Sequence, residues 1–122
     1  MKENKFRVWD VSGQKYIYDI LLSDEGTAYR YSMFETLDQI TRDIIIEWST
    51  GLHDNNKYEW YHNDIITDGK KNWLIDYNEE YLTWVLTNPN MKGTINLCGI
   101  NSRLFHRIGN IHENPELLET HA

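Results

Sequence analysis

The chain of 122 residues has a single cysteine, two prolines and few basic side chains. Cys98 has no partner for an intramolecular disulfide, so a small disulfide-bonded scaffold is excluded and the fold must depend on a hydrophobic core. No stretch approaches the roughly 18 consecutive apolar residues that a membrane-spanning helix requires. The first ten residues are polar where a secretory signal would be apolar. We therefore expect a cytoplasmic protein.

Basic residues are outnumbered by acidic ones. Lys and Arg total 12 against 19 Asp and Glu, which gives a net charge of -7. This charge repels phosphate backbones and disfavours generic nucleic-acid binding. Apolar residues make up 40% and charged residues 25%, as in ordinary globular proteins. We expect one domain over residues 1–122, divided at most into two lobes, 1–42 and 43–122.

Short aromatic and β-branched segments, separated by turn residues, fill most of the chain. Segments 5–10 and 15–22 flank a Gly-containing connection and predict a β-hairpin, and the period-two alternation within 28–34 predicts a third strand. Further strand candidates are 63–67, 72–77, 81–87, 94–100 and 103–111. The pattern predicts a mainly β fold, a small barrel or sandwich of short antiparallel strands.

Local rules conflict between residues 33 and 51. Phe34, Leu37 and Ile40 have helical spacing, whereas three consecutive isoleucines, 44–46, favour a strand because branching at Cβ suits a pleated sheet. We predict a short helix near 36–42, followed by a strand from Asp43.

The C-terminal stretch RIGNIHENPELLE, residues 107–119, combines a strand end with the start of a helix. Gly109 predicts a β-bulge, Asn114 is a favourable N-cap, and Pro115 suits the first helical position. A one-turn helix near 115–119 is therefore expected, in which an acidic residue favours the helix dipole and two leucines pack back on the sheet. The residues of this structural motif are Gly109, Asn110, Asn114, Pro115, Glu116, Leu117 and Leu118.

Three segments together resemble the YopX family of phage and prophage proteins: KFRVWD (5–10), TGLHDNNKYEWYHNDII (50–66) and IGNIHENPELLE (108–119). The resemblance implies an all-β fold whose second half is similar to an SH3-like barrel, and it implies no activity and no catalytic residues. At two positions where the family pattern has glycine, this chain carries Asn56 and Asn63. If these positions need positive φ, Asn is the next most tolerant residue.

The residues offer no catalytic motif of their own. The five histidines form no compact metal motif, and the glycines are isolated at turns rather than gathered in a phosphate-binding loop. Carboxylates are numerous, as in any acidic protein, and Asp64 has a structural role as acceptor for the backbone N–H groups of a turn. We expect a protein that is not an enzyme and holds neither a cofactor nor a metal.

Aromatic residues make up 13% of the chain and have two interpretations. Packing in the core and across strands is favoured. The alternative places Trp60, Tyr61 and Tyr77 on an exposed face that binds an extended peptide or stacks unpaired bases. The favoured function is a non-catalytic module for protein interaction or self-assembly. Its expected partner is an unknown host or phage protein or a second copy of the chain, and no membrane partner is expected. The alternative is a small barrel that binds single-stranded nucleic acid.

Overall fold

A computed structural model describes residues 5–32, 34 and 36–119. The strands are β1 (Phe6–Asp10), β2 (Lys15–Ile17), β3 (Ile20–Leu22), β4 (Ala28–Tyr31), β5 (Leu37–Gln39), β6 (Ile44–His53), β7 (Glu59–Tyr61), β8 (Asp64–Thr67), β9 (Asn72–Asn78), β10 (Thr83–Thr87), β11 (Ile95–Asn96) and β12 (His106–Asn110). Three short 3₁₀ helices lie among the described residues: η1 (Leu97–Gly99), η2 (Ser102–Leu104) and η3 (Pro115–Leu118). The predicted mainly β class is confirmed.

The chain forms two compact units. Residues 6–47 make up the N-terminal unit, and residues 1–5 with 48–122 make up the C-terminal unit. Strand β6 belongs to both, because it begins at Ile44 and ends at His53. Residue contacts thus divide the chain after Glu47, whereas the sequence suggested a lobe boundary after Arg42. The assignment of residues 1–122 to one family domain stays a prediction.

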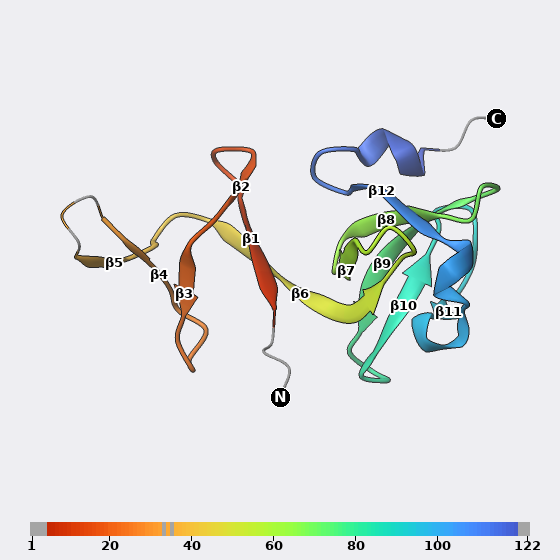
Figure 1. Ribbon diagram of the computed structural model, residues 1–122, viewed down its shortest axis with the longest axis horizontal. Coiled ribbons are helices and arrows are strands. Elements are labelled where there is room, and N and C mark those ends of the chain that lie inside the picture. Colours follow the sequence, from red (N-terminus) through yellow and green to blue (C-terminus); the bar gives the residue numbers. More distant parts are fainter. Residues whose placement is uncertain (1–4, 33, 35, 120–122) are drawn as a thin grey trace. The chain divides into compact units, whose positions relative to one another are not determined.

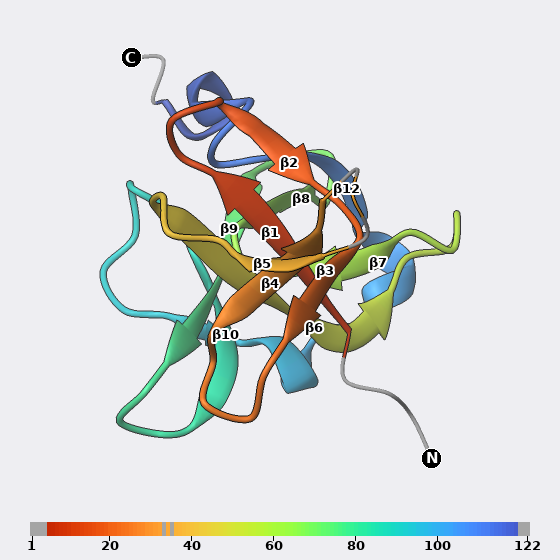
Figure 2. The same cartoon turned by 90° about the vertical axis from the view of Figure 1, so that its left-hand side faces the viewer.

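The N-terminal unit contains the predicted hairpin of β1 and β2, in which Trp9 lies opposite Tyr16. A three-stranded antiparallel sheet follows, with β4 between β3 and β5 (Figure 2). Glu47 is fully buried, and it accepts hydrogen bonds from Arg7 Nε at 2.7 Å and Tyr16 Oη at 2.8 Å. The Arg7 guanidinium carbon also lies 4.7 Å from the centroid of the Tyr16 ring. A cation, an aromatic ring and a carboxylate therefore meet at one point.

The predicted helix near 36–42 is wrong, because residues 37–39 form strand β5. Leu37 pairs with Tyr31 of β4, and all three residues of β5 are exposed. A helix of two turns is marginal unless it buries an apolar face, and the exposed Leu37 shows that no such burial occurs. The backbone of Ser32 and Thr36 instead closes a tight connection, with Ser32 N donating to Thr36 O at 2.7 Å. Pairing with β4 therefore determines the structure of this segment, although its apolar residues have helical spacing.

The C-terminal unit contains a five-stranded antiparallel sheet in the order β11-β10-β9-β8-β12 (Figure 1). Strand β7 pairs with the part of β6 that belongs to this unit. One face of the sheet carries the core, whose buried members are Trp60, Ile66, Trp73, Ile75, Leu86 and Leu97. The sheet supplies the rigid frame for the side chains considered below. The finer assignment to an SH3-like barrel stays a prediction.

The C-terminal motif forms the predicted β-bulge and the one-turn helix. The register of β12 against β8 shifts between Arg107 and Gly109, and η3 begins at Pro115 as expected. Asn114 is the N-cap residue of η3 as predicted, but its side chain makes no cap hydrogen bond. Its Oδ1 instead accepts from Asn110 N at 3.3 Å, back towards the strand. The carbonyl of Leu117 accepts a 2.8 Å hydrogen bond from Asn72 Nδ2, which ties η3 to β9.

Asn63 lies in the turn between β7 and β8 and has a φ of +72°. The resemblance to the family, whose pattern has glycine at this position, suggested a positive φ here. Its backbone N–H donates to Ile75 O, and its carbonyl accepts from Ile111 N, both at 2.9 Å. Asn56 does not show positive φ in the described chain; the neighbouring Lys57 does, at +65°. The expected positive φ is therefore present at Asn63, whereas in the other turn it occurs at Lys57, one residue after Asn56.

Replacing Asn63 by Gly is expected to raise the free energy of unfolding by about 0.5 kcal/mol, because Gly adopts the left-handed conformation without strain. The matched variant Asn56→Gly should lower stability by a similar amount, since it only increases the freedom of the unfolded chain. Urea denaturation of the two variants beside the unmodified protein measures both effects. A loss of stability in Asn63→Gly would contradict the prediction.

Candidate binding groove

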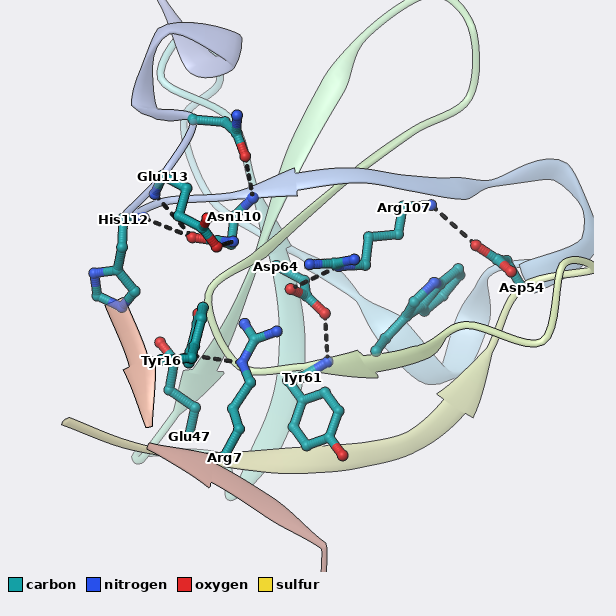
Figure 3. Close-up of polar contacts among 12 residues, drawn as sticks. Arg7, Tyr16, Glu47, Asp54, Tyr61, Asp64, Arg107, Asn110, His112 and Glu113 are labelled. Carbon is teal, nitrogen blue, oxygen red and sulfur yellow. Dashed lines mark hydrogen bonds and ion pairs between the residues drawn. The ribbon is translucent and has the colours of Figure 1, made fainter. Parts of the chain in front are cut away.

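A buried carboxylate fixes the turn between β7 and β8. Asp64 is the first residue of β8 and is completely buried. Its Oδ2 accepts from Tyr61 N at 2.8 Å, and its Oδ1 accepts from Arg107 Nε at 3.1 Å (Figure 3). The prediction that Asp64 accepts a backbone N–H of the turn is confirmed. The turn is thereby held against β12, and the position of His62 within it is set.

Asp54 is a second buried carboxylate, directly after the last residue of β6. Its oxygens accept backbone N–H groups from Asn56 at 2.9 Å, Tyr58 at 3.2 Å and Arg107 at 3.0 Å. Burial alone would raise the pKa of the Asp54 carboxyl, but these N–H donors hold the pKa below its usual range. Arg107 thus reaches Asp54 with its backbone and Asp64 with its side chain (Figure 3).

The lowered pKa of Asp54 predicts a loss of stability in acid. A carboxyl whose pKa is lower in the folded state stabilises fully above the unfolded pKa of about 3.9, and this contribution disappears as pH falls through the folded value. We expect Asp54→Asn to flatten the decrease in free energy of unfolding on acidification below about pH 4. Urea denaturation at a series of pH values measures the slope. An unchanged slope in the variant would show that Asp54 is not responsible.

The hairpin of β9 and β10 brings two aromatic rings together at its end. Tyr77 and Trp84 are directly paired across the strands, and their ring centroids are 5.0 Å apart with an interplanar angle of 75°. The ring of His62 lies 5.5 Å from that of Trp84, at 66°. Edge-to-face arrangements of this kind are favoured between aromatic rings. The three rings therefore support one another on the sheet.

A hydrogen bond joins His62 and Asp76 beside these rings. His62 Nε2 lies 2.8 Å from Asp76 Oδ1, and the same oxygen accepts from Tyr77 N at 2.9 Å. The side chains are only partly buried, with 28% of His62 and 46% of Asp76 exposed. The carboxylate is therefore positioned by its neighbours while it remains open to solvent.

These side chains line an open groove of about 460 Å³ in the C-terminal unit. Its volume lies within the range of roughly 300–1,000 Å³ that is common for ligand sites. The aromatic groove, as we name it, is lined by Trp48, His62, Asp76, Tyr77, Glu79 and Trp84. Trp48 comes from β6 and is 41% exposed. The lining combines three large aromatic residues with two carboxylates, and no Lys or Arg is among these described lining residues.

The side chains that line the aromatic groove determine which chemistry it could support. A His–Asp pair can orient an imidazole as a base, but nucleophilic catalysis also needs an activated nucleophile within its reach. The described lining of the aromatic groove contains no Ser, Thr or Cys. In the described part of the chain, no group of three or more His, Cys, Asp or Glu residues is placed to hold a metal ion.

Among the described residues, none of the helices has the length and apolar character that a membrane span requires.

The three aromatic residues predicted for an exposed face lie in different places. Trp60 is completely buried in the core, so its assignment to a binding face is wrong and the favoured core interpretation applies. It is the middle residue of β7, between two partly exposed neighbours, and alternation directs it to the core side. Tyr61 is half-buried and does not line the aromatic groove. Only Tyr77 does.

Sequence reasoning missed Trp48, Trp84, Glu79 and the pairing of His62 with Asp76. The signal that could have identified Trp84 was the turn sequence Asn78, Glu79 and Glu80, because it indicates a hairpin whose strands place Trp84 near Tyr77. The sequence suggested a strand from Tyr81, whereas β10 begins at Thr83. Because a shift in register changes which residues are opposite each other, this longer loop concealed the pair of Tyr77 and Trp84.

Comparison with known proteins places the chain in a family. A search of curated proteins found no match. Among solved structures, the chain is similar to protein EF1440 from Enterococcus faecalis, with 24% identity, a TM-score of 0.60, and coverage of 96% of this chain and 99% of that one. It is also similar to the protein yopX from Bacillus subtilis, with 18% identity, a TM-score of 0.60, and coverage of 98% and 100%. The family model described as YopX protein matches residues 5–119, and the chain therefore belongs to the YopX family.

Proposed function

We propose that this protein is a non-catalytic protein-interaction module that binds its partner through the aromatic groove. The observation that carries the proposal is the exposure of Trp48 beside Tyr77 and Trp84, in a groove with carboxylates. Tyr and Trp are enriched in protein interfaces, where they supply large contact areas at a small cost in side-chain entropy. Their support on a sheet leaves the groove preformed, which lowers the cost of binding further.

The family resemblance supplies the biological setting of the proposal. The module acts as a phage or prophage accessory protein in the cytoplasm of the host cell. Its partner is a host or phage protein, or a second copy of the chain. No chemical step is assigned to it.

Affinity purification tests the proposal. The tagged full chain is expressed in cells that carry the phage or prophage, and the proteins recovered are identified by mass spectrometry. Trp48→Ser should lose the specific partner, while Tyr58→Ser, which removes a 58% exposed tyrosine that does not line the groove, should retain it. Thermal melting confirms that both variants fold, and analytical ultracentrifugation detects self-assembly.

Two results would overturn the proposal. One is the recovery of no specific partner by a chain that is monomeric in solution. The other is equal recovery of the partner by Trp48→Ser and the unmodified protein.

Single-stranded nucleic acid is the alternative ligand, since aromatic side chains on small barrels stack unpaired bases. We give it less weight because Asp76 and Glu79 would face phosphate groups in the aromatic groove. A gel shift at low salt, where electrostatic attraction is strongest, discriminates the two ligands. A shift that is lost in Trp48→Ser would favour nucleic acid over protein.

A further inference from the structure

We infer that the aromatic groove receives an arginine side chain from a basic segment of the partner. This inference rests on the proposed function and names the chemistry that the partner must present. It follows from the aromatic rings and the carboxylates of the groove, taken together with the planar shape of the guanidinium group.

The aromatic rings provide a surface that attracts cations. Trp is the side chain with the strongest cation–π attraction, which acts within about 6 Å of the ring centroid. Trp48 and Trp84 both line the groove, and Tyr77 packs against Trp84 with its ring centroid 5.0 Å away. A cation that enters the groove therefore meets several rings at once.

The carboxylates determine the sign of the ligand. Asp76 is partly exposed although it pairs with His62, and Glu79 is exposed at the end of the β9–β10 hairpin. The whole chain has a net charge of -7, so the surrounding field adds to the attraction for a basic segment. An acidic or strongly apolar ligand would leave these carboxylates uncompensated.

Arginine fits this combination better than lysine. Its planar guanidinium stacks on aromatic rings, donates two parallel hydrogen bonds to one carboxylate, and is more weakly hydrated than an ammonium group. The aromatic groove offers both kinds of partner side by side. A lysine ammonium would use the charge but not the planar geometry.

The N-terminal unit shows the same chemistry within the chain. Arg7 lies 4.7 Å from the centroid of the Tyr16 ring, and its Nε donates to Glu47 at 2.7 Å. There the cation, ring and carboxylate belong to one compact unit. In the aromatic groove, the ring and carboxylate are present and the cation would come from the partner.

Two peptides of equal length test the inference on the full-length protein. Each has nine residues, with Gly and Ser flanking three spaced arginines in one and three citrullines in the other. Citrulline has nearly the same shape as arginine and no charge. NMR titration follows the indole N–H signals of Trp48 and Trp84, and the arginine peptide should bind at least tenfold more tightly.

Neighbouring glutamates provide a matched pair of variants. Both are exposed, but Glu79 lines the aromatic groove and Glu80 does not. Glu79→Gln should weaken binding of the arginine peptide roughly three- to fivefold, as expected for a partly exposed charge pair. Glu80→Gln should weaken it much less.

Equal affinities for the arginine and citrulline peptides would overturn the inference. So would equal effects of Glu79→Gln and Glu80→Gln, because they would indicate a general response to net charge. Neither result affects the proposed function, which depends on recovery of a partner by the unmodified protein and its loss in Trp48→Ser. Recovery of a partner together with equal peptide affinities would therefore reject the arginine ligand alone.

Discussion

Replacing Asp64 by Asn is expected to lower the free energy of unfolding by about 3 kcal/mol. The Asp64 carboxylate is completely buried and accepts from both Tyr61 N and Arg107 Nε. An Asn side chain has one acceptor oxygen and one NH₂ group. Its NH₂ group would therefore face one of these two donors. The variant would therefore lose a charge-assisted hydrogen bond and leave a donor without an acceptor.

The loss of stability should be specific to this buried position. Urea denaturation of Asp64→Asn beside Glu80→Gln compares a buried with an exposed carboxylate, and the exposed change should alter the free energy of unfolding by less than about 0.5 kcal/mol. Similar small effects of both changes would contradict the structural role of Asp64.

A double-mutant cycle separates the ion pair from the backbone hydrogen bond. Arg107→Gln should cost about as much as Asp64→Asn, because it leaves the completely buried Asp64 carboxylate without its cation. If the two side chains act together, the double variant should be more stable than the sum of the two losses predicts. Additive losses would assign the effect of Asp64 to interactions other than its ion pair with Arg107, among them the hydrogen bond from Tyr61 N.

Much of the fold followed from local sequence signals. The β1–β2 hairpin had a Gly-containing connection between two aromatic segments. The positive φ of Asn63 was suggested instead by the resemblance to the family, in which glycine stands at that position. The helix near 36–42 failed because residues 37–39 pair with β4, an interaction that local periodicity does not contain.

The candidate site was much harder to predict than the fold. Trp60 and Tyr77 are both aromatic residues next to turns, yet one lies in the core and the other in the aromatic groove. The groove joins residues of β6, the β7–β8 turn and the β9–β10 hairpin, and only strand order and register bring these together. A sequence shows which residues are aromatic or acidic, but long-range pairing decides which of them meet.

Replacing Gly109 by Ala is expected to lower the free energy of unfolding by about 2 kcal/mol, within the range for overpacked sites. A Cβ at this position would meet the Asn114 side chain, with Cγ at 2.8 Å, Cβ at 2.9 Å and Oδ1 closer still. Asn114 cannot move freely, because its Oδ1 accepts from Asn110 N and its own N–H donates to Asn110 O at 2.9 Å. The requirement for Gly therefore comes from close approach at the β-bulge.

Gly99→Ala is the matched control for this prediction, since a Cβ there would meet no atom of its non-adjacent described neighbours within 4 Å. It should change the free energy of unfolding by less than about 0.5 kcal/mol. A second comparison adds Gly109→Ala to a chain that already carries Asn114→Gly, in which the opposing side chain is absent. If close approach is the cause, most of the 2 kcal/mol penalty should disappear in that background. A penalty that persists would contradict close approach to Asn114 as the reason for glycine at this position.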